Sequence, residues 1–453
     1  MAKACERGGV RETFRIVWPL ALAMAAGAAN HVCDRLFLAH SSDASLAASL
    51  PAMMVATMFV VFFSTTIGYS AVFVSQFHGG GRGRDAVRSF AQGLWLWLMA
   101  LPLLVAVVPA CWFVVDLAGH PEAVRLAERS YLTVYAPGGI FTVLNVILGG
   151  VITGQGRTLY VSFATIAGCI TNLVLDPLFI FGAGPIPALG LTGAAVAFVC
   201  AGAVTTALLA GAVLRDRLVR DGWRTGAFAF DRALSLEILR YGSPVGLSAF
   251  IASVAFTAFT LVVGNLDELS SAASNTVFAV NNVFYLALCA TAEGVRILTG
   301  RYHGARDDDA AERVYYSGLK MVFVAMAVCF LVAIPGAGFI MDLFRGADSA
   351  FDPEVYRHTG FVLFCIMFFR EIAEAVICIS MGALRGVGDT RYVMLVQSGV
   401  DVFVWIPLVF AVAKWHPTVF ALWMTMPVAL GLMALLFLVR WRRGGWRGVD
   451  LVS

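Results

Sequence analysis

Long apolar stretches separated by short polar segments dominate this chain. Twelve such stretches, each about 20 residues or longer, are present. Apolar runs of that length can cross the hydrocarbon core of a bilayer as helices. The pattern therefore predicts an all-α integral membrane protein with twelve transmembrane helices. They lie at about 14–39, 50–77, 90–117, 131–153, 158–182, 190–214, 241–264, 273–299, 315–342, 357–384, 392–413 and 418–439.

The composition agrees with a membrane location and narrows the chemistry. Hydrophobic residues make up 60% of the 453 residues and charged residues 13%, whereas soluble domains carry about 25% charged residues. The net charge of +3 predicts no nucleic-acid partner. The nine cysteines include no CxxC pair, so we expect neither a disulfide framework nor a zinc site. The expected surroundings are the lipid bilayer.

Lys and Arg residues are distributed unequally between the two sides of the predicted helices. If the N-terminus is placed inside the cell, most of the 32 Lys and Arg residues fall in loops on the cytoplasmic side. Cytoplasmic loops retain an excess of positive charge. The sequence therefore predicts a multi-pass protein of the inner (plasma) membrane with both termini in the cytoplasm.

The two halves of the sequence resemble each other. WPLALAM (18–24) at the start of the first span corresponds to SPVGLSA (243–249) at the start of the seventh, and FHGGGRGRDA (77–86) corresponds to YHGARDDDA (302–310). Both pairs are about 225 residues apart, and both halves begin on the same side of the membrane. A parallel repeat of this kind is typical of carriers in which two bundles move about a central site.

The predicted domain organisation follows from this repeat. Residues 1–214 are expected to form an N-terminal six-helix lobe, and residues 241–453 a C-terminal six-helix lobe. Residues 215–240 are basic and are expected to form a cytoplasmic linker. The predicted fold is therefore a pair of pseudo-symmetric six-helix bundles.

Two carboxylates are expected at membrane depth in the N-terminal lobe. Asp34 lies about twenty residues along the first span and Asp176 about eighteen along the fifth. Because both spans run outward at about 1.5 Å per residue, the two carboxylates can share a level. A charge at such depth costs at least about 2.5–3.5 kcal/mol, which indicates a functional role. Asn172 lies one turn before Asp176 on the same face, and Thr192 lies at nearly the same level.

Two carboxylates, an amide and a hydroxyl provide oxygen ligands for a small monovalent cation. Two like charges brought close also hold a proton on one of them, so Na⁺ and H⁺ are both candidates. Pro177 removes a backbone hydrogen bond in the fifth helix and predicts a hinge beside the site. A structural interpretation stays open, in which Asp176 caps a neighbouring helix and Asp34 pairs with Arg35 at the membrane surface.

The C-terminal lobe carries secondary coupling candidates. Glu374 lies about mid-depth in the tenth span and Asp401 about mid-depth in the eleventh. Arg370 precedes Glu374 by one turn, so an internal ion pair and a coupling role are both compatible with the sequence. Glu293 and Arg296 lie near the inner end of the eighth span, where long side chains reach the membrane surface.

An ordered set of motifs resembles the multidrug and toxic compound extrusion (MATE) family of secondary antiporters. The motifs extend over essentially the whole chain. They are Pro19 with CDRLFLAH in the first span, VSQFHGG after the second, GVITGQGRT and NLVLDPLFIFG around the fifth, LGLTGAAVA at the sixth and GALRGVGDT before the eleventh.

The resemblance implies two six-helix lobes arranged as a V. It implies a transporter, not an enzyme, that exports organic cations or other amphipathic compounds in exchange for Na⁺ or H⁺, with no other metal or cofactor. It also implies that Asp34, Asn172 and Asp176 form the cation site, and that Glu374 matches an acid of the tenth span. The family's threonine in the sixth span is Phe198 here, so Thr192 is the substitute. We expect a monomer.

Exporters of lipid-linked sugars or polysaccharides share this architecture and form the alternative function. They often line the central cavity with several basic residues. Arg370 is the one arginine expected deep within a predicted span. The sequence therefore favours the drug exporter over the lipid flippase.

Overall fold

The computed structural model describes residues 7–41, 43–117, 121–182, 184–185, 187–345, 352–449 and 451. Within these ranges the chain contains helices and turns but no β-strand, which confirms the predicted fold class. The first half forms α1 (Val10–Ala39), α2 (Asp43–Gly68), α3 (Ser70–Gly79), α4 (Gly83–Leu117), α5 (Glu122–Gly154), α6 (Thr158–Ile180), α7 (Leu191–Arg215) and α8 (Arg217–Arg224). The second half forms α9 (Arg232–Gly264), α10 (Glu268–Gly304), α11 (Asp308–Ala333), α12 (Ala337–Phe344), α13 (Pro353–Val387), α14 (Thr390–Val400), the π-helix η1 (Asp401–Trp405), α15 (Ile406–Trp415) and α16 (Val419–Arg442).

Eleven helical segments of the described chain are long and apolar enough to cross a membrane. They correspond to eleven of the twelve predicted spans. The exception is α13, which has 35 residues and is long enough for a hydrocarbon core of about 30 Å. Its apolar sequence is interrupted by Arg370, Glu371 and Glu374. The remaining predicted span is therefore a long helix with a charged centre.

The ninth predicted span, 315–342, is divided in the structure. Helix α11 ends at Ala333, and the separate short helix α12 begins at Ala337. Pro335 disfavours a helical conformation of the residue before it and cannot donate a backbone hydrogen bond. The break therefore follows from a proline whose effect the apolar pattern does not reveal.

The segment 215–240, predicted as a linker, is folded and docked on α4. It contains α8 and the first residues of α9. The side chain of Gln92 on α4 donates to the Ala229 carbonyl at 3.0 Å and accepts from the Asp231 amide at 2.8 Å. Trp95 Nε1 donates to the Phe228 carbonyl at 3.0 Å. These bonds attach the segment to the first half of the chain.

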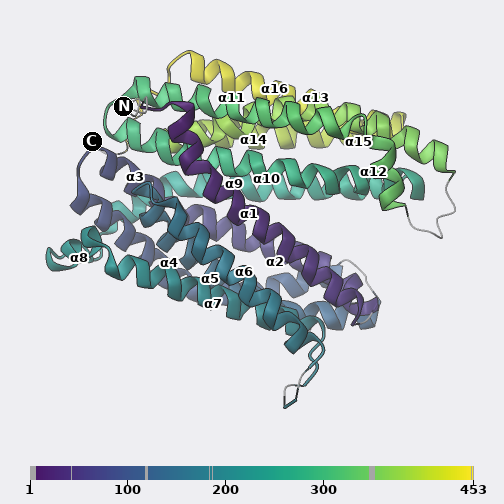
Figure 1. Cartoon of the computed structure of the whole chain (residues 1–453), viewed down its shortest axis with the longest axis horizontal. Coiled ribbons are helices and arrows are strands. Elements are labelled where there is room, and N and C mark those ends of the chain that lie inside the picture. Colours follow the sequence, from purple (N-terminus) through teal and green to yellow (C-terminus); the bar gives the residue numbers. More distant parts are fainter. Residues whose placement is uncertain are drawn as a thin grey trace, which may run out of the picture.

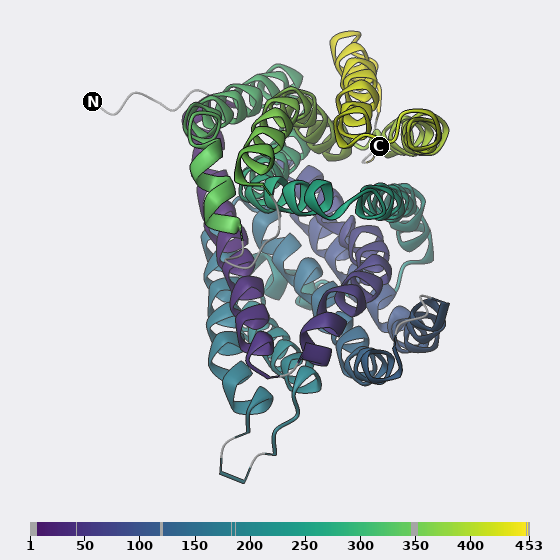
Figure 2. The ribbon, with the colours of Figure 1, turned by 90° about the vertical axis from the view of Figure 1, so that its right-hand side faces the viewer.

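The helices form two groups that lie side by side. In Figure 1 the helices α2 and α4–α8 occupy the lower part and α10–α16 the upper part, with α3 between them beside α10, and Figure 2 shows the same separation from the end. Helix α9 contacts α2 on one side and α14 on the other. Helix α1 begins against α10 and α11 and continues along α6. The start of α1 lies at the same end as α8 in Figure 1, and we call it the terminal end.

The two groups are in close contact near the terminal end. The Tyr69 hydroxyl donates to the Arg385 carbonyl at 2.6 Å, and Gln76 Nε2 donates to the Gly386 carbonyl at 2.8 Å. Both bonds join the α2–α3 region to the last turn of α13. A Cβ atom at Gly79 would collide with the backbone carbonyl of Arg301 on α10. Glycine at this position therefore permits direct backbone packing between the groups.

We expect the substitution Gly79→Ala to destabilise the protein. The added methyl group meets backbone atoms that cannot rotate away, and overpacking of this kind typically costs about 1–3 kcal/mol. The check is the thermal unfolding midpoint of purified protein in detergent. Gly431→Ala is the matched control, because a Cβ there has open space around it and alanine favours a helix by up to about 1 kcal/mol. Equal midpoints for Gly79→Ala and wild type would contradict the close contact.

Candidate functional site

Asp34 and Asp176 lie together where α1 packs against α6. Asn172 Nδ2 donates to Asp176 Oδ1 at 3.2 Å, and Asn30 Nδ2 contacts Asp34 Oδ1 at 3.4 Å. Asn30 also donates to the Asn172 carbonyl oxygen. Asp176 is completely buried, whereas 23% of the Asp34 side chain is exposed. The four side chains form a continuous polar group, which we call the α1–α6 site.

Two oxygen atoms of the α1–α6 site lack a donor among the described residues. They are Asp176 Oδ2 and Asn30 Oδ1, and both are buried. The carboxyl groups of Asp34 and Asp176 are within hydrogen-bonding reach of each other. Ionised carboxylates only accept hydrogen bonds, so the two carboxyl groups cannot satisfy each other while both are ionised. Buried oxygen atoms without donors are candidate ligands for a cation.

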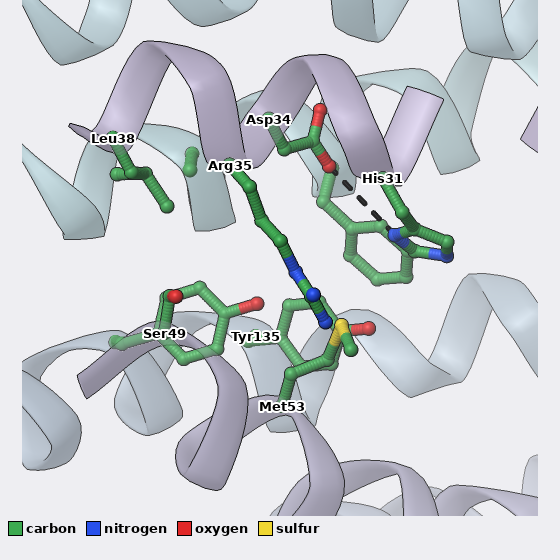
Figure 3. A pocket seen from close by; sticks show the side chains of 10 residues that line it. His31, Asp34, Arg35, Leu38, Ser49, Met53 and Tyr135 are labelled. Carbon is green, nitrogen blue, oxygen red and sulfur yellow. Dashed lines mark ion pairs between the residues drawn. The ribbon is translucent and has the colours of Figure 1, made fainter. Parts of the chain in front are cut away.

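A pocket adjoins the α1–α6 site on the side of Asp34 (Figure 3). Its cavity volume is about 40 Å³, and about 10–15 Å³ of such volume holds one water molecule. Arg35 extends across the pocket from α1 toward Met53 in Figure 3. The lining comes from α1, α2, α5 and α7 and comprises His31, Asp34, Arg35, Leu38, Ser49, Met53, Tyr131, Tyr135, Ala194 and Phe198.

Three stacked aromatic rings form one wall of this pocket. The ring centroids of Tyr131 and Tyr135 are 4.9 Å apart, and those of Tyr135 and Phe198 are 4.4 Å apart. In the same pocket, His31 Nδ1 lies 3.8 Å from Asp34 Oδ2. Phe198, which stands where the family's threonine was expected, therefore contributes a flat apolar surface. Aromatic faces next to a carboxylate can attract an amphipathic cation.

Thr192 was predicted as a ligand of the ion site and Pro177 as a hinge beside it. The Thr192 hydroxyl is hydrogen-bonded to the Ser130 hydroxyl at 2.7 Å, so its bonding partner is not a carboxylate. Helix α6 continues through Pro177 to Ile180. The Phe181 amide donates to the Pro177 carbonyl at 3.2 Å. The hinge at Pro177 stays a prediction.

A second polar group lies between α10 and α13 in the other half. Asn281 Nδ2 donates to Glu371 Oε1 at 2.6 Å, and Arg370 is paired with the same carboxylate. Arg370 Nη2 reaches Glu374 Oε2 at 3.5 Å. The internal ion pair considered from the sequence is therefore present, but the nearer carboxylate is Glu371. Sequence reasoning missed Glu371 because helical spacing favours partners three or four residues apart.

Asp401 is the first residue of η1, the five-residue π-helix within the eleventh span. It is 4% exposed, and its Oδ2 has no donor in the described part of the chain. Glu374 is the charged residue that acts on it electrostatically. Single π-helical turns inside α-helices frequently mark functional sites. Glu374 and Asp401, the two predicted secondary candidates, are therefore close enough to interact electrostatically, but no hydrogen bond joins them in the described part of the chain.

Known proteins resemble the chain over most of its length. The "Probable multidrug resistance protein NorM" of Deinococcus radiodurans is 27% identical over 325 residues, which cover 72% of this chain and 70% of that protein. The protein of the same name in Acinetobacter baylyi is 22% identical over 439 residues and 95% of both chains. The solved structure described as "MATE in complex with MaL6" is 18% identical, with a TM-score of 0.84 over 98% of this chain and 99% of that one. That likeness supports the same fold.

The family comparison covers both halves of the repeat. The family model described as MatE matches residues 19–178 and 244–410. The two matches begin at Pro19 and Pro244, the prolines that first indicated the internal repeat. They include α1 and α6, which form the α1–α6 site, and the centre of α13. The chain therefore belongs to the MATE (MatE) family of membrane transporters.

Proposed function

We propose that this protein exports amphipathic organic compounds, including organic cations, across the plasma membrane in exchange for Na⁺ or H⁺. The relatives named as multidrug resistance proteins support the substrate class. The observation that carries the ion coupling is the buried Asp176 Oδ2, which has no donor in the described chain and lies beside a second carboxyl group. We place both termini in the cytoplasm, as the charge distribution predicts.

The α1–α6 site provides oxygen ligands from carboxylates and amides. A Na⁺ ion would be held by Asp34, Asp176, the Asn172 side chain and the free oxygen of Asn30. A proton would be held between the two carboxyl groups. Either ion removes one negative charge from a buried position, which lowers the cost of keeping that charge in a bilayer.

Asp34 connects ion binding with the pocket, because it belongs to both. Its carboxylate bonds to the α1–α6 site and also lines the cavity beside the stacked aromatic rings. An organic cation in the pocket is attracted by the ionised carboxylate, and an ion at the α1–α6 site cancels that attraction. Each ligand therefore weakens the other, and such negative coupling is reciprocal by thermodynamic linkage. This is mutual exclusion, the property that exchange requires.

Exchange also requires that ion binding favours one conformation over another. A ligand that binds two conformations equally shifts nothing. Pro177 lies next to Asp176 on α6 and leaves the carbonyl one turn earlier without its helical donor. We propose that α6 bends at this position when Asp176 is neutralised, and that the two groups of helices then move relative to each other.

We expect Asp176→Asn to abolish gradient-driven ethidium efflux from cells that lack their own pumps. The neutral amide removes the charge that an entering ion neutralises, so the gradient no longer drives transport. The measurement is the initial efflux rate at equal expression under an imposed Na⁺ or H⁺ gradient. Asp342→Asn is the control, because that carboxylate pairs with Arg357 at an exposed position. Efflux by Asp176→Asn at the wild-type rate would remove Asp176 from the coupling.

We expect Asn30→Ala to weaken ion coupling and Thr192→Val to leave it nearly unchanged. Asn30 joins Asp34 to Asn172, and a hydrogen bond to a charged group contributes about 1.5–3 kcal/mol. Half-maximal efflux should then need about ten times more coupling ion. Thr192 bonds to Ser130 instead. The measurement is the dependence of efflux on ion concentration in sealed vesicles; the reverse order of the two variants would contradict the assignment.

A further inference from the structure

Arg385 lies inside the helix bundle, although it follows directly after the predicted tenth span (357–384). It belongs to the last turns of α13, and its Nη2 donates to Ser248 Oγ on α9 at 3.3 Å and to Gln397 Oε1 on α14 at 3.2 Å. Both acceptors are neutral. Its Nε is buried and has no acceptor among the described residues. Arg385 is therefore a charged group held in place by three helices with part of its bonding capacity unused.

No carboxylate within the described ranges forms an ion pair with Arg385. Arg296 on α10 is the neighbouring charge that acts on Arg385 most strongly, and Arg296 is already paired with Glu293. The three side chains together carry one excess positive charge. Charged side chains inside a membrane protein are normally paired with one another or line a pathway for a substrate or ion. The missing negative charge is the feature that needs an explanation.

The charges beside Arg385 are not fully enclosed by protein. The side chains of Arg296 and Glu293 are 17% and 31% exposed, and Tyr285, about two helical turns before Glu293 on α10, is 38% exposed. On the side toward the terminal end, the first half of the chain packs against Arg385, because the Tyr69 hydroxyl donates to the Arg385 carbonyl. Arg385 therefore lies next to the contact between the two groups of helices.

We propose that Arg385, with Arg296 beside it, binds an anionic group of the transported molecule, either a carboxylate or a phosphate. A guanidinium presents fixed N–H donors that match such oxygen atoms and forms strong charge-assisted hydrogen bonds with them. The inference rests on the proposed export function and specifies its substrates further. The accepted molecules include amphipathic compounds that carry an acidic group, in addition to simple organic cations.

Binding of two dyes to protein in nanodiscs tests this site without any ion gradient. Rhodamine B carries a free carboxylate, and its ethyl ester has the same cationic ring system without that negative charge. Fluorescence polarisation gives the Kd of each dye for wild type, Arg385→Gln and Arg385→Lys in phosphatidylcholine discs. Arg129→Gln is the control variant, because that arginine pairs with Asp116 at an exposed position. Gel filtration verifies that each variant is folded and monodisperse.

We expect Arg385→Gln to weaken rhodamine B binding about tenfold or more, as the loss of a charge-assisted hydrogen bond implies, and to change the ester's Kd less than about twofold. Arg385→Lys should recover most of the rhodamine B affinity. Unchanged rhodamine B binding in Arg385→Gln, equal weakening of both dyes, or no rhodamine B binding by wild type would each overturn the proposal.

Two further arms separate the remaining interpretations. If phosphatidylglycerol in the discs displaces rhodamine B from wild type but not from Arg385→Gln, the anionic group is a lipid headgroup; without displacement, it belongs to a soluble compound. Ethidium efflux by wild type is measured in parallel. If Arg385→Gln selectively loses rhodamine B binding but wild type shows no ethidium efflux, the anion site is supported and the proposed drug export is overturned.

Discussion

A carboxylate within a bilayer has to be neutralised, and the first half of this protein is arranged around that constraint. Asp176 is completely buried, and Asn172 satisfies one of its two oxygen atoms while the other has no donor in the described chain. Packing of α1 against α6 brings the carboxyl group of Asp34 to the same place. A stable protein would normally fill such a position with an apolar side chain. Two acids at such a position are the basis of the ion exchange proposed above.

Much of the fold could be predicted from the sequence, because the bilayer imposes long apolar helices. The exceptions arise where a single residue overrides the apolar pattern. Pro335 separates α11 from α12, and the charged centre of α13 is stabilised by partners on another helix, such as Asn281. The π-helix at Asp401 had no signal in the sequence. Such features depend on tertiary contacts, which hydropathy does not record.

The positions of Asp34 and Asp176 along their predicted spans were enough to predict that the two carboxylates share a level. They could not identify every neighbouring side chain. Asn30 lies one turn from Asp34 and could have been found by the spacing that identified Asn172. The partner of Thr192 could not have been found from the sequence. The rotation of α7 about its axis decides whether the Thr192 hydroxyl faces Ser130 or the two acids. Arg385 fell just outside the predicted tenth span because α13 extends farther than its apolar run.

Helix α1 is fastened to both groups of helices. Near its start, Ser317 on α11 donates to the Gly8 carbonyl and Tyr302 on α10 donates to Glu12. Asp34 lies about seven turns away, against α6. Pro19 interrupts the backbone hydrogen bonding of α1 between these two attachments. One continuous helix thus ties the two groups together, so any change in their relative position would have to be accommodated along α1, between Glu12 and Asp34.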